Sequence, residues 1–265
     1  MDIFKLSLPQ GRELPIVANL PHSGLFVPYS IAAQMTLQHW WSLPNSDWHL
    51  DRLYDFLPAL GVTVLQATHS RYVVDLNRAV KPPIFGSFWS SVAPETTAFD
   101  QPIYQSKPSQ VEVEQRIDAF YNPYHAKLEE LLQQKIDRFG YVYLFDLHSF
   151  LGLINDDICL GNRNGKTCSE KFITIVKQAF QSQSYQVVKN KVFNGGYITG
   201  HYGERSNVEA LQIEVRYPVY LKKEQLDQAD PPDWNVPELV AAKRRFERVF
   251  TIAINLLMHN KNSSA

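Results

Sequence analysis

The sequence contains only two cysteines, Cys159 and Cys168, among 265 residues. Two thiols that lie so close together in the chain do not make a disulfide framework, and this scarcity fits a reducing compartment. Residues 1–5 also lack the basic region and apolar core that a signal peptide requires. These absences predict a cytoplasmic protein.

The sequence has almost no net charge either, with 26 Lys and Arg residues against 27 Asp and Glu residues. Such a balance gives no global field that would attract nucleic acid or an anionic membrane. No apolar run reaches the roughly 18 residues of a membrane span. We therefore expect a small-molecule partner, with no nucleic acid and no membrane, while the oligomeric state stays open.

What the sequence does contain is enough apolar material for a core, since 45% of its residues are hydrophobic and 20% are charged. We expect one domain over residues 1–265. Residues 79–109 carry five prolines, too many for regular interior structure, and are predicted to form an ordered loop excursion that serves as a lid or a substrate wall. Residues 260–265 are predicted to be a flexible tail.

Short apolar runs and helical periodicities alternate along the chain. The runs predict strands at 14–20, 62–67, 141–149, 157–160, 185–188 and 208–216, with a further extended segment at 71–75. The periodicities predict helices at 44–61, 111–139, 169–180 and 237–259, the second of them kinked or split near Asn122 because Pro123 follows. Strands separated by helices favour an α/β fold with a mostly parallel sheet.

The strand at 141–149 ends in Asp146, His148 and Ser149. Open α/β sheets place their ligands at the carboxyl ends of strands, and an imidazole there can bind a metal or act as a base. Asp146 could be a second ligand or could orient a neighbouring histidine. A plain pair of polar groups that satisfies the turn backbone is the alternative.

Two further candidate ligands lie at predicted element boundaries, His22 after the first strand and Asp47 at a helix start. With His148 they give two imidazoles and one carboxylate, which is a common catalytic zinc set when a fourth position stays open. Asp51, one turn later, competes with Asp47. Capping and solvation of the helix are the alternative for both carboxylates.

Arg71, Asn77 and Arg78 form a second group of candidates. Guanidinium groups bind carboxylates with two parallel hydrogen bonds, and an amide supplies a further donor, so these side chains suit an acidic substrate. A structural ion pair between Asp75 and Arg78 is the alternative reading.

Glu214 lies inside an otherwise apolar strand, where a charge is costly unless it is paired. A catalytic role and a buried pair with Arg216 compete as explanations. Thr199, His201 and Tyr202 lie between glycines, and this concentration of hydrogen-bonding groups indicates a loop that contacts substrate.

An ordered series of these segments resembles the N-formylglutamate amidohydrolase family, the deformylases of histidine degradation. No single segment is specific, but the series occurs in the family's order and spans nearly the whole chain. The matching runs are 21–24 (PHSG), 46–49 (SDWH), 53–55 (LYD), 70–78 (SRYVVDLNR), 123–125 (PYH), 146–149 (DLHS), 195–199 (GGYIT), 201–203 (HYG) and 212–214 (QIE).

The resemblance extends to zinc carboxypeptidases and aspartoacylases, and it implies a mixed sheet with helices on both faces. It implies that zinc, or another divalent ion, is held by His22, Asp47 and His148. Asp47 is preferred to Asp51 because it falls within a matching run. The implied reaction is metal-dependent hydrolysis of N-formyl-L-glutamate to formate and L-glutamate.

The resemblance also implies roles for the remaining candidates. Glu214 would be the general base and acid, and Arg71 would stabilise the oxyanion. Asn77 and Arg78 would bind substrate oxygens. Gly200 departs from the family, in which a basic residue often precedes the HYG run, and this leaves the identity of the N-acyl amino acid open. Hydrolysis of another N-acyl amino acid or of a C-terminal peptide bond, and non-catalytic binding of an acidic metabolite, remain as alternatives.

Overall fold

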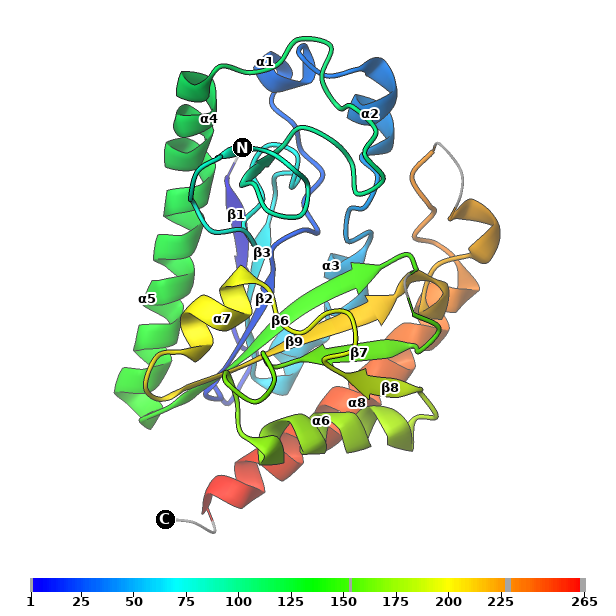
Figure 1. The fold of residues 1–265 in the computed structure, drawn as a ribbon. Helices are drawn as coiled ribbons and strands as arrows, with labels where there is room; N and C mark the ends of the chain where they lie inside the picture. Colours follow the sequence, from blue (N-terminus) through cyan, green and yellow to red (C-terminus); the bar gives the residue numbers. More distant parts are fainter. Residues whose placement is uncertain (1, 153, 227–229, 263–265) are drawn as a thin grey trace.

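A seven-stranded sheet forms the centre of the protein in the computed structural model, which describes residues 2–152, 154–226 and 230–262 (Figure 1). The spatial order is β1-β3-β2-β6-β9-β7-β8. In chain order the strands are β1 (Phe4–Ser7), β2 (Ile16–Leu20), β3 (Thr63–Ala67), β6 (Val142–Phe150), β7 (Ile158–Gly161), β8 (Val187–Lys189) and β9 (Val208–Arg216).

The four central strands β3, β2, β6 and β9 run parallel to one another. β1 pairs antiparallel with β3 at one side, and β7 pairs antiparallel with β9 at the other, where β8 follows β7 in parallel. The predicted mixed, mostly parallel sheet is therefore confirmed. Because the parallel strands share a direction, the ends of β2, β6 and β9 lie at one edge of the sheet.

Helices cover both faces of the sheet, as predicted (Figure 1). One face packs against α5 (Asn122–Phe139) and α7 (Tyr197–Gly203), through strand residues such as Val17 and Leu144. The other face packs against α3 (Leu50–Leu53), α6 (Glu170–Ser182) and α8 (Pro237–Asn262), through Ala18 and Phe145. Neighbouring strand residues thus point into opposite cores, which explains why β2 and β6 are buried along their whole length and mostly apolar.

The predicted helix at 111–139 is interrupted as expected. It consists of α4 (Gln110–Arg116), a π-helical stretch (Ile117–Tyr121) and α5. Ser109 begins α4 with a capping box, in which its side chain accepts a hydrogen bond from the backbone of Glu112 and the Glu112 carboxylate accepts one in return. Pro123 lacks the N–H that a regular helix would use, so the irregular stretch directly precedes it.

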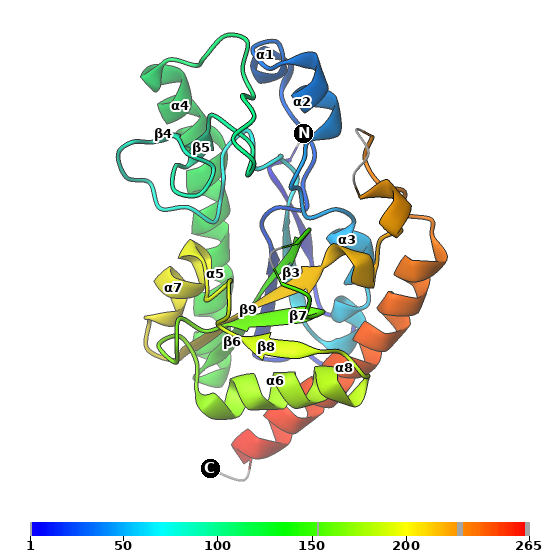
Figure 2. The ribbon, with the colours of Figure 1, turned by 45° about the vertical axis from the view of Figure 1, so that its right-hand side comes forward.

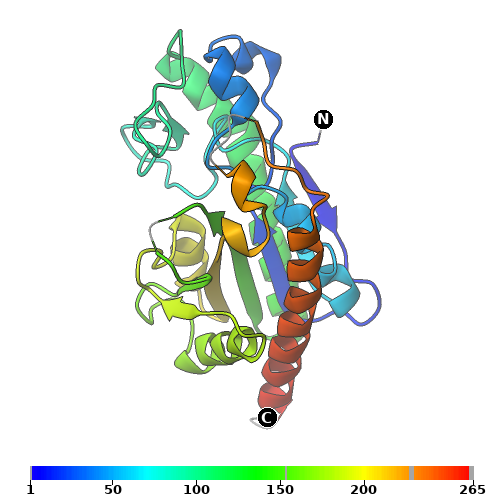
Figure 3. The same cartoon turned by 90° about the vertical axis from the view of Figure 1, so that its right-hand side faces the viewer.

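The upper part of the molecule is irregular. It contains α1 (Tyr29–Ala32), α2 (Leu37–Ser42) and the 79–109 segment, which carries two short paired strands, β4 (Phe85–Gly86) and β5 (Ala93–Pro94) (Figure 2). Figure 3 shows this part above the sheet and α8 descending along the side toward the C-terminus. Apart from these two strands, residues 79–109 form turns, bends and isolated bridges.

Two of the predicted elements are wrong. Residues 44–61 do not form one helix, because Asn45 and His49 have φ values of 60° and 56°, which no helix accommodates. Only α3 and a 3₁₀ turn (Leu57–Leu60) form there, so Asp47 caps no helix. Residues 71–73 form a turn and residues 74–75 have no regular structure, so the extended segment predicted at 71–75 is absent.

Two smaller differences concern the short elements and the C-terminal end of the chain. The sequence did not predict β1, α1, α2 or α7. Residues 260–262, predicted as part of a tail, belong to α8, and residues 263–265 lie outside the described part. Throughout the described part, no helix combines the length and the apolar character needed to cross a membrane.

Candidate metal centre and active site

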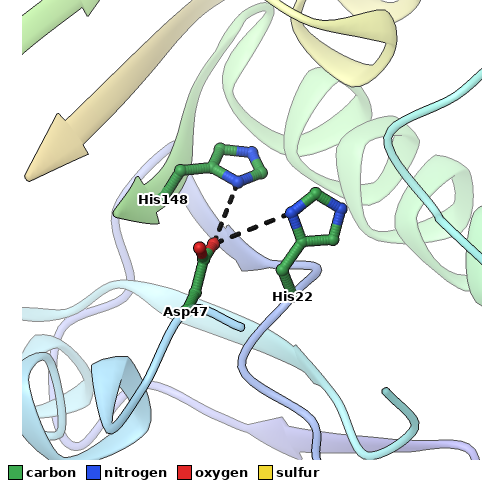
Figure 4. Close-up of side chains that lie close together, drawn as sticks. All are labelled: His22, Asp47 and His148. Atoms are coloured by element: carbon green, nitrogen blue, oxygen red, sulfur yellow. Dashed lines mark hydrogen bonds and ion pairs between the residues drawn. The ribbon is translucent and has the colours of Figure 1, made fainter. Parts of the chain in front are cut away.

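The three predicted metal ligands lie together at the carboxyl edge of the sheet (Figure 4). His22 follows β2, His148 lies near the end of β6, and Asp47 stands on the loop before α3. The ligand atoms of all three lie within 4.8 Å of one another, and all three residues are buried. The backbone N–H of Asp47 donates to the carbonyl of His22, which fixes the loop beside the strand end.

The imidazole of His22 has one ring nitrogen engaged and one free. Its Nε2 lies 2.7 Å from the Asp75 carboxylate, whereas Nδ1 is buried, has no hydrogen-bond partner in the described part of the chain and lies 3.7 Å from Oδ2 of Asp47. Burial and the nearby Arg71 lower the pKa of His22 to about 4. The ring is therefore neutral at pH 7, with its proton on Nε2 and its Nδ1 lone pair directed at Asp47.

His148 repeats this arrangement from the other side. Its Nδ1 lies 3.1 Å from Oδ2 of Asp47, and its Nε2 lies 3.1 Å from Oδ1 of Asp146. Burial acts to lower the pKa of His148, but Asp146 and Asp47 outweigh it and hold the pKa well above its ordinary value. The side chains of Asn19 and Thr199 donate to Asp146 and fix it behind the ring.

These contacts fit a divalent cation. Two imidazole nitrogens and a carboxylate oxygen converge, and the buried Nδ1 of His22 lies 3.7 Å from the Asp47 carboxylate without a hydrogen bond among the described residues. Each ring is also fixed from behind by a carboxylate, which is the usual support of a metal-bound histidine. Asp51 lies in the first turn of α3 and does not belong to this group of ligands.

Asp75 is the residue whose role the sequence assigned least well. It forms no ion pair with Arg78 and instead accepts hydrogen bonds from His22, from Arg71 at 2.6 Å and from the backbone of Asn77 at 2.8 Å. Burial acts to raise its pKa, but Arg71 and His22 prevail and keep the pKa well below the ordinary value. Asp75 is thus an anion that orients His22.

Glu214 is paired with His148 in the register between β6 and β9. Its carboxylate accepts a hydrogen bond from the Gln212 side chain at 2.8 Å, and Gln212 in turn accepts one from the backbone of Gly196 at 2.6 Å. Arg216 donates to a backbone carbonyl instead, so the alternative of a Glu214–Arg216 pair is wrong. Burial, reinforced by the nearby aspartates, raises the pKa of Glu214 to about 8.

A cavity of about 630 Å³ opens over these groups. Arg71 and Arg78 both line it. Arg71 donates to Asp75 and to the carbonyl of Asn45, while its Nε is buried and has no hydrogen-bond partner among the residues that the structure describes. The hydrogen bonds that Arg78 forms within the described residues go to the carbonyls of Phe88 and Asn77, and burial lowers its pKa.

Of the five residues predicted to bind substrate, two line the cavity and three do not. Arg78 and Asn77 line the cavity, whereas Thr199, His201 and Tyr202 do not. Thr199 is fully buried behind Asp146, and His201 lies exposed on α7. The glycine pair that suggested a loop begins this helix, which turns these side chains away from the cavity.

Tyr202 is also buried, and its hydroxyl lies 2.9 Å from Nδ1 of His125. Nδ2 of Asn77 lies 3.2 Å from Nε2 of His148, and its Oδ1 accepts a hydrogen bond from the backbone of Ile198. A Cβ atom at Gly196 would collide with the Asn77 side chain, so glycine is required there for close approach.

The sequence did not assign site roles to Asp75 or Gln212, and although it predicted a substrate wall from residues 79–109, it did not identify the aromatic residues of that wall. Asp75 and Gln212 both lie within runs that match the family, and this position was the feature of the sequence that could have indicated a role in the site. The wall residues Phe88, Trp89 and Phe99 fall in the proline-rich excursion, whose path the sequence pattern could not specify.

The comparison with protein families agrees with this geometry. A model described as N-formylglutamate amidohydrolase matches residues 14–221, which include all the site residues described above. The chain belongs to the N-formylglutamate amidohydrolase family.

Individual relatives support the same family. An N-formylglutamate deformylase of Pseudomonas putida is 32% identical over 233 residues, covering 82% of this chain and 85% of the relative. One from Pseudomonas aeruginosa is 31% identical over 231 residues, covering 83% and 86%. The crystal structure of an N-formylglutamate amidohydrolase from Ralstonia eutropha JMP134 superposes with a TM-score of 0.82 at 26% identity, covering 98% of this chain and 100% of that one.

Proposed function

We propose that the protein, with residues 1–265 acting as one amidohydrolase domain, is a metal-dependent enzyme that hydrolyses N-formyl-L-glutamate to formate and L-glutamate, as in histidine degradation. The observation that carries the proposal is the unpartnered Nδ1 of His22, directed at Asp47 beside His148. Membership of the N-formylglutamate amidohydrolase family supplies the substrate.

The proposed ion is zinc, because imidazole and carboxylate ligands suit it, and it would be held by His22, Asp47 and His148. When bound there, zinc would polarise the formyl carbonyl and make a water molecule more acidic. Asp75 and Asp146 keep the two imidazoles oriented for this ligation.

Glu214 is the proposed general base and acid. It lines the cavity next to His148, and its raised pKa brings its proton affinity close to the working pH. In this role Glu214 takes a proton from the attacking water and passes it to the leaving nitrogen. Gln212 holds the carboxylate in one orientation throughout.

The two arginines have different proposed roles. Arg71 presents an unpartnered Nε–H from a side chain that Asp75 has already fixed, so it is suited to stabilise the oxyanion. Arg78 forms no ion pair in the described part of the chain and is suited to bind a substrate carboxylate, with Asn77 beside it. Thr199 and Tyr202 support the site from behind, and His201 takes no part.

The test is glutamate release from N-formyl-L-glutamate by the purified protein before chelation, after chelation and after zinc is restored. Release that disappears and returns with zinc supports both the reaction and the ion. The variant Glu214→Gln should keep a full complement of zinc and lose at least about 100-fold in kcat. Absence of release from the zinc-loaded protein, or an active Glu214→Gln variant, would contradict the proposal.

A further inference from the structure

The cavity is polar at its floor and apolar at its mouth. The floor holds the metal centre, Glu214 and the two arginines. Two apolar walls rise from it, one from the 79–109 segment and one from the chain after β6 and β8. The first wall comprises Phe88, Trp89, Ala98 and Phe99, and the second comprises Phe150, Leu151, Val192 and Phe193.

The mouth exposes large apolar side chains to water. Trp89 is 54% exposed, Phe99 is 63% exposed and Val192 is 44% exposed. Each wall is anchored by a buried ring: Phe88 contacts Trp89 edge to face at 5.1 Å, and Phe150 contacts Phe193 at 5.0 Å. Exposed apolar groups that rim a cavity around polar groups are typical of a site that covers an apolar part of its ligand.

The charged groups of the cavity also favour a ligand that is partly apolar and carries one carboxylate. Arg71 and Arg78 are the guanidinium groups among its lining residues, and Arg71 is already neutralised by Asp75. Arg78 is therefore the one guanidinium of the lining that is left to bind a ligand carboxylate, whereas N-formylglutamate carries two carboxylates. The side chain of Arg163 lies beside Gly200: a Cβ atom added at Gly200 would be 2.8 Å from Nη1 of Arg163. Arg163 does not line the cavity, so it adds no positive charge there.

We propose that the apolar walls bind an aromatic or aliphatic group, so that the enzyme also hydrolyses N-acyl amino acids that carry one carboxylate and one such group. The proposal rests on the proposed amidohydrolase reaction at the floor of the cavity. The chemistry is unchanged: one water is consumed, the acyl C–N bond breaks, and a carboxylic acid and a free amino acid are released. The apolar group belongs either to the amino acid or to the acyl chain.

Two isomeric substrates distinguish these positions. N-formyl-L-phenylalanine carries the aromatic ring on the amino acid, and N-phenylacetylglycine carries it on the acyl group. The zinc-loaded protein is assayed for release of phenylalanine, glycine and, from N-formyl-L-glutamate, glutamate. A kcat/KM for either isomer that is at least one tenth of the value for N-formyl-L-glutamate supports the proposal, and lower values for both overturn it.

Wall variants test where the ring binds. Trp89→Ala should lower kcat/KM for the preferred isomer about tenfold and change that for N-formyl-L-glutamate less than about threefold. Trp40→Ala, which removes a 43% exposed indole from α2 outside the cavity, is the matched control and should change neither. Equal losses on both substrates in Trp89→Ala would contradict binding of the ring at this wall.

A binding measurement separates failure of this inference from failure of the proposed reaction. Calorimetric titration of the catalytically blocked Glu214→Gln protein gives Kd values for N-formyl-L-phenylalanine, N-phenylacetylglycine and N-formyl-L-glutamate. If no substrate is cleaved by the wild-type protein, the proposed reaction fails, yet a Kd for one isomer no weaker than that for N-formyl-L-glutamate still supports the apolar site. Weaker binding of both isomers, by more than tenfold, overturns it.

Discussion

Asp75 lies 2.7 Å from Nε2 of His22 and turns the opposite ring nitrogen toward Asp47. The contact joins two residues 53 positions apart, and Arg71 holds the carboxylate from its other side. An anion behind the ring raises the basicity of the nitrogen that faces forward. The affinity for the proposed metal would therefore depend partly on a residue that does not belong to the candidate ligands.

Replacing Asp75 with asparagine should weaken zinc binding about 10- to 100-fold, because the neutral amide orients His22 less strongly and leaves Arg71 without its charge partner. Competition with a chromogenic chelator measures the affinity directly. Asp55→Asn, at an exposed carboxylate that pairs with Lys243, is the control and should bind zinc as the wild type does. Unchanged affinity in Asp75→Asn would refute the orienting role.

The stability of the metal-free protein should fall as the pH rises from about 6.5 to about 8. Over this range folded Glu214, with its pKa of about 8 against 4.5, retains a proton that the unfolded chain has lost. His148, whose pKa is also raised, likewise makes the stability fall as the pH rises. The lowered pKa of His22 affects the stability only between about pH 4 and pH 6.5, below this range. A state that binds more protons is destabilised by a rise in pH.

Calorimetric melting in chelator at pH 6.5, 7.2 and 8 measures this dependence. The Glu214→Gln variant lacks the titrating group and should show a shallower fall in Tm over the same range. A slope equal to that of the wild type would mean that Glu214 is already ionised in the folded protein.

Gln212→Leu should lower kcat about tenfold or more while leaving zinc content unchanged. The substitution keeps most of the side-chain volume but removes the donor to Glu214 and leaves the Gly196 N–H without its acceptor. Steady-state kinetics with metal analysis provide the measurement. Gln134→Leu, on an exposed face of α5, is the control; a loss confined to KM would assign Gln212 to substrate binding instead.

Thr199→Val and His201→Ala test the revised view of α7. Loss of the Thr199 hydroxyl should cost about 1–3 kcal/mol in the free energy of unfolding, because the buried Asp146 carboxylate loses a donor. His201→Ala should leave stability and kcat/KM nearly unchanged. Urea denaturation measures the stability and steady-state kinetics measure kcat and KM. A raised KM with normal stability in either variant would support the original prediction that this residue binds substrate.

The sequence predicted the positions of the functional groups better than their surroundings. The runs that end at His22 and His148 are predominantly apolar because both faces of a central parallel strand are covered, and that pattern is local in the sequence. Polar residues at the ends of such strands must meet at one edge of the sheet. For this reason the candidate metal centre could be assembled without coordinates.

Asp47 shows the limit of this reasoning. Its run has helical spacing, but backbone conformations with positive φ at Asn45 and His49 place it on an irregular loop. Those conformations are imposed by tertiary contacts such as the bond from the Asp47 backbone to His22. The sequence pattern fails in the same way for the cavity wall, because the 79–109 segment has almost no regular structure and its path depends on what it packs against.

The π-helical stretch Ile117–Tyr121 has a consequence for how such a cavity changes during evolution. α5 lies against the central sheet, whereas Arg116 at the end of α4 bonds to Tyr104 of the 79–109 segment. A π-helical stretch corresponds to one inserted residue, and one residue turns an α-helix by about 100°. Insertion or loss of a single residue here would rotate α4, and with it the contact from Arg116 to the 79–109 segment, relative to the candidate site that the sheet carries, and so offers a short mutational route to a reshaped cavity.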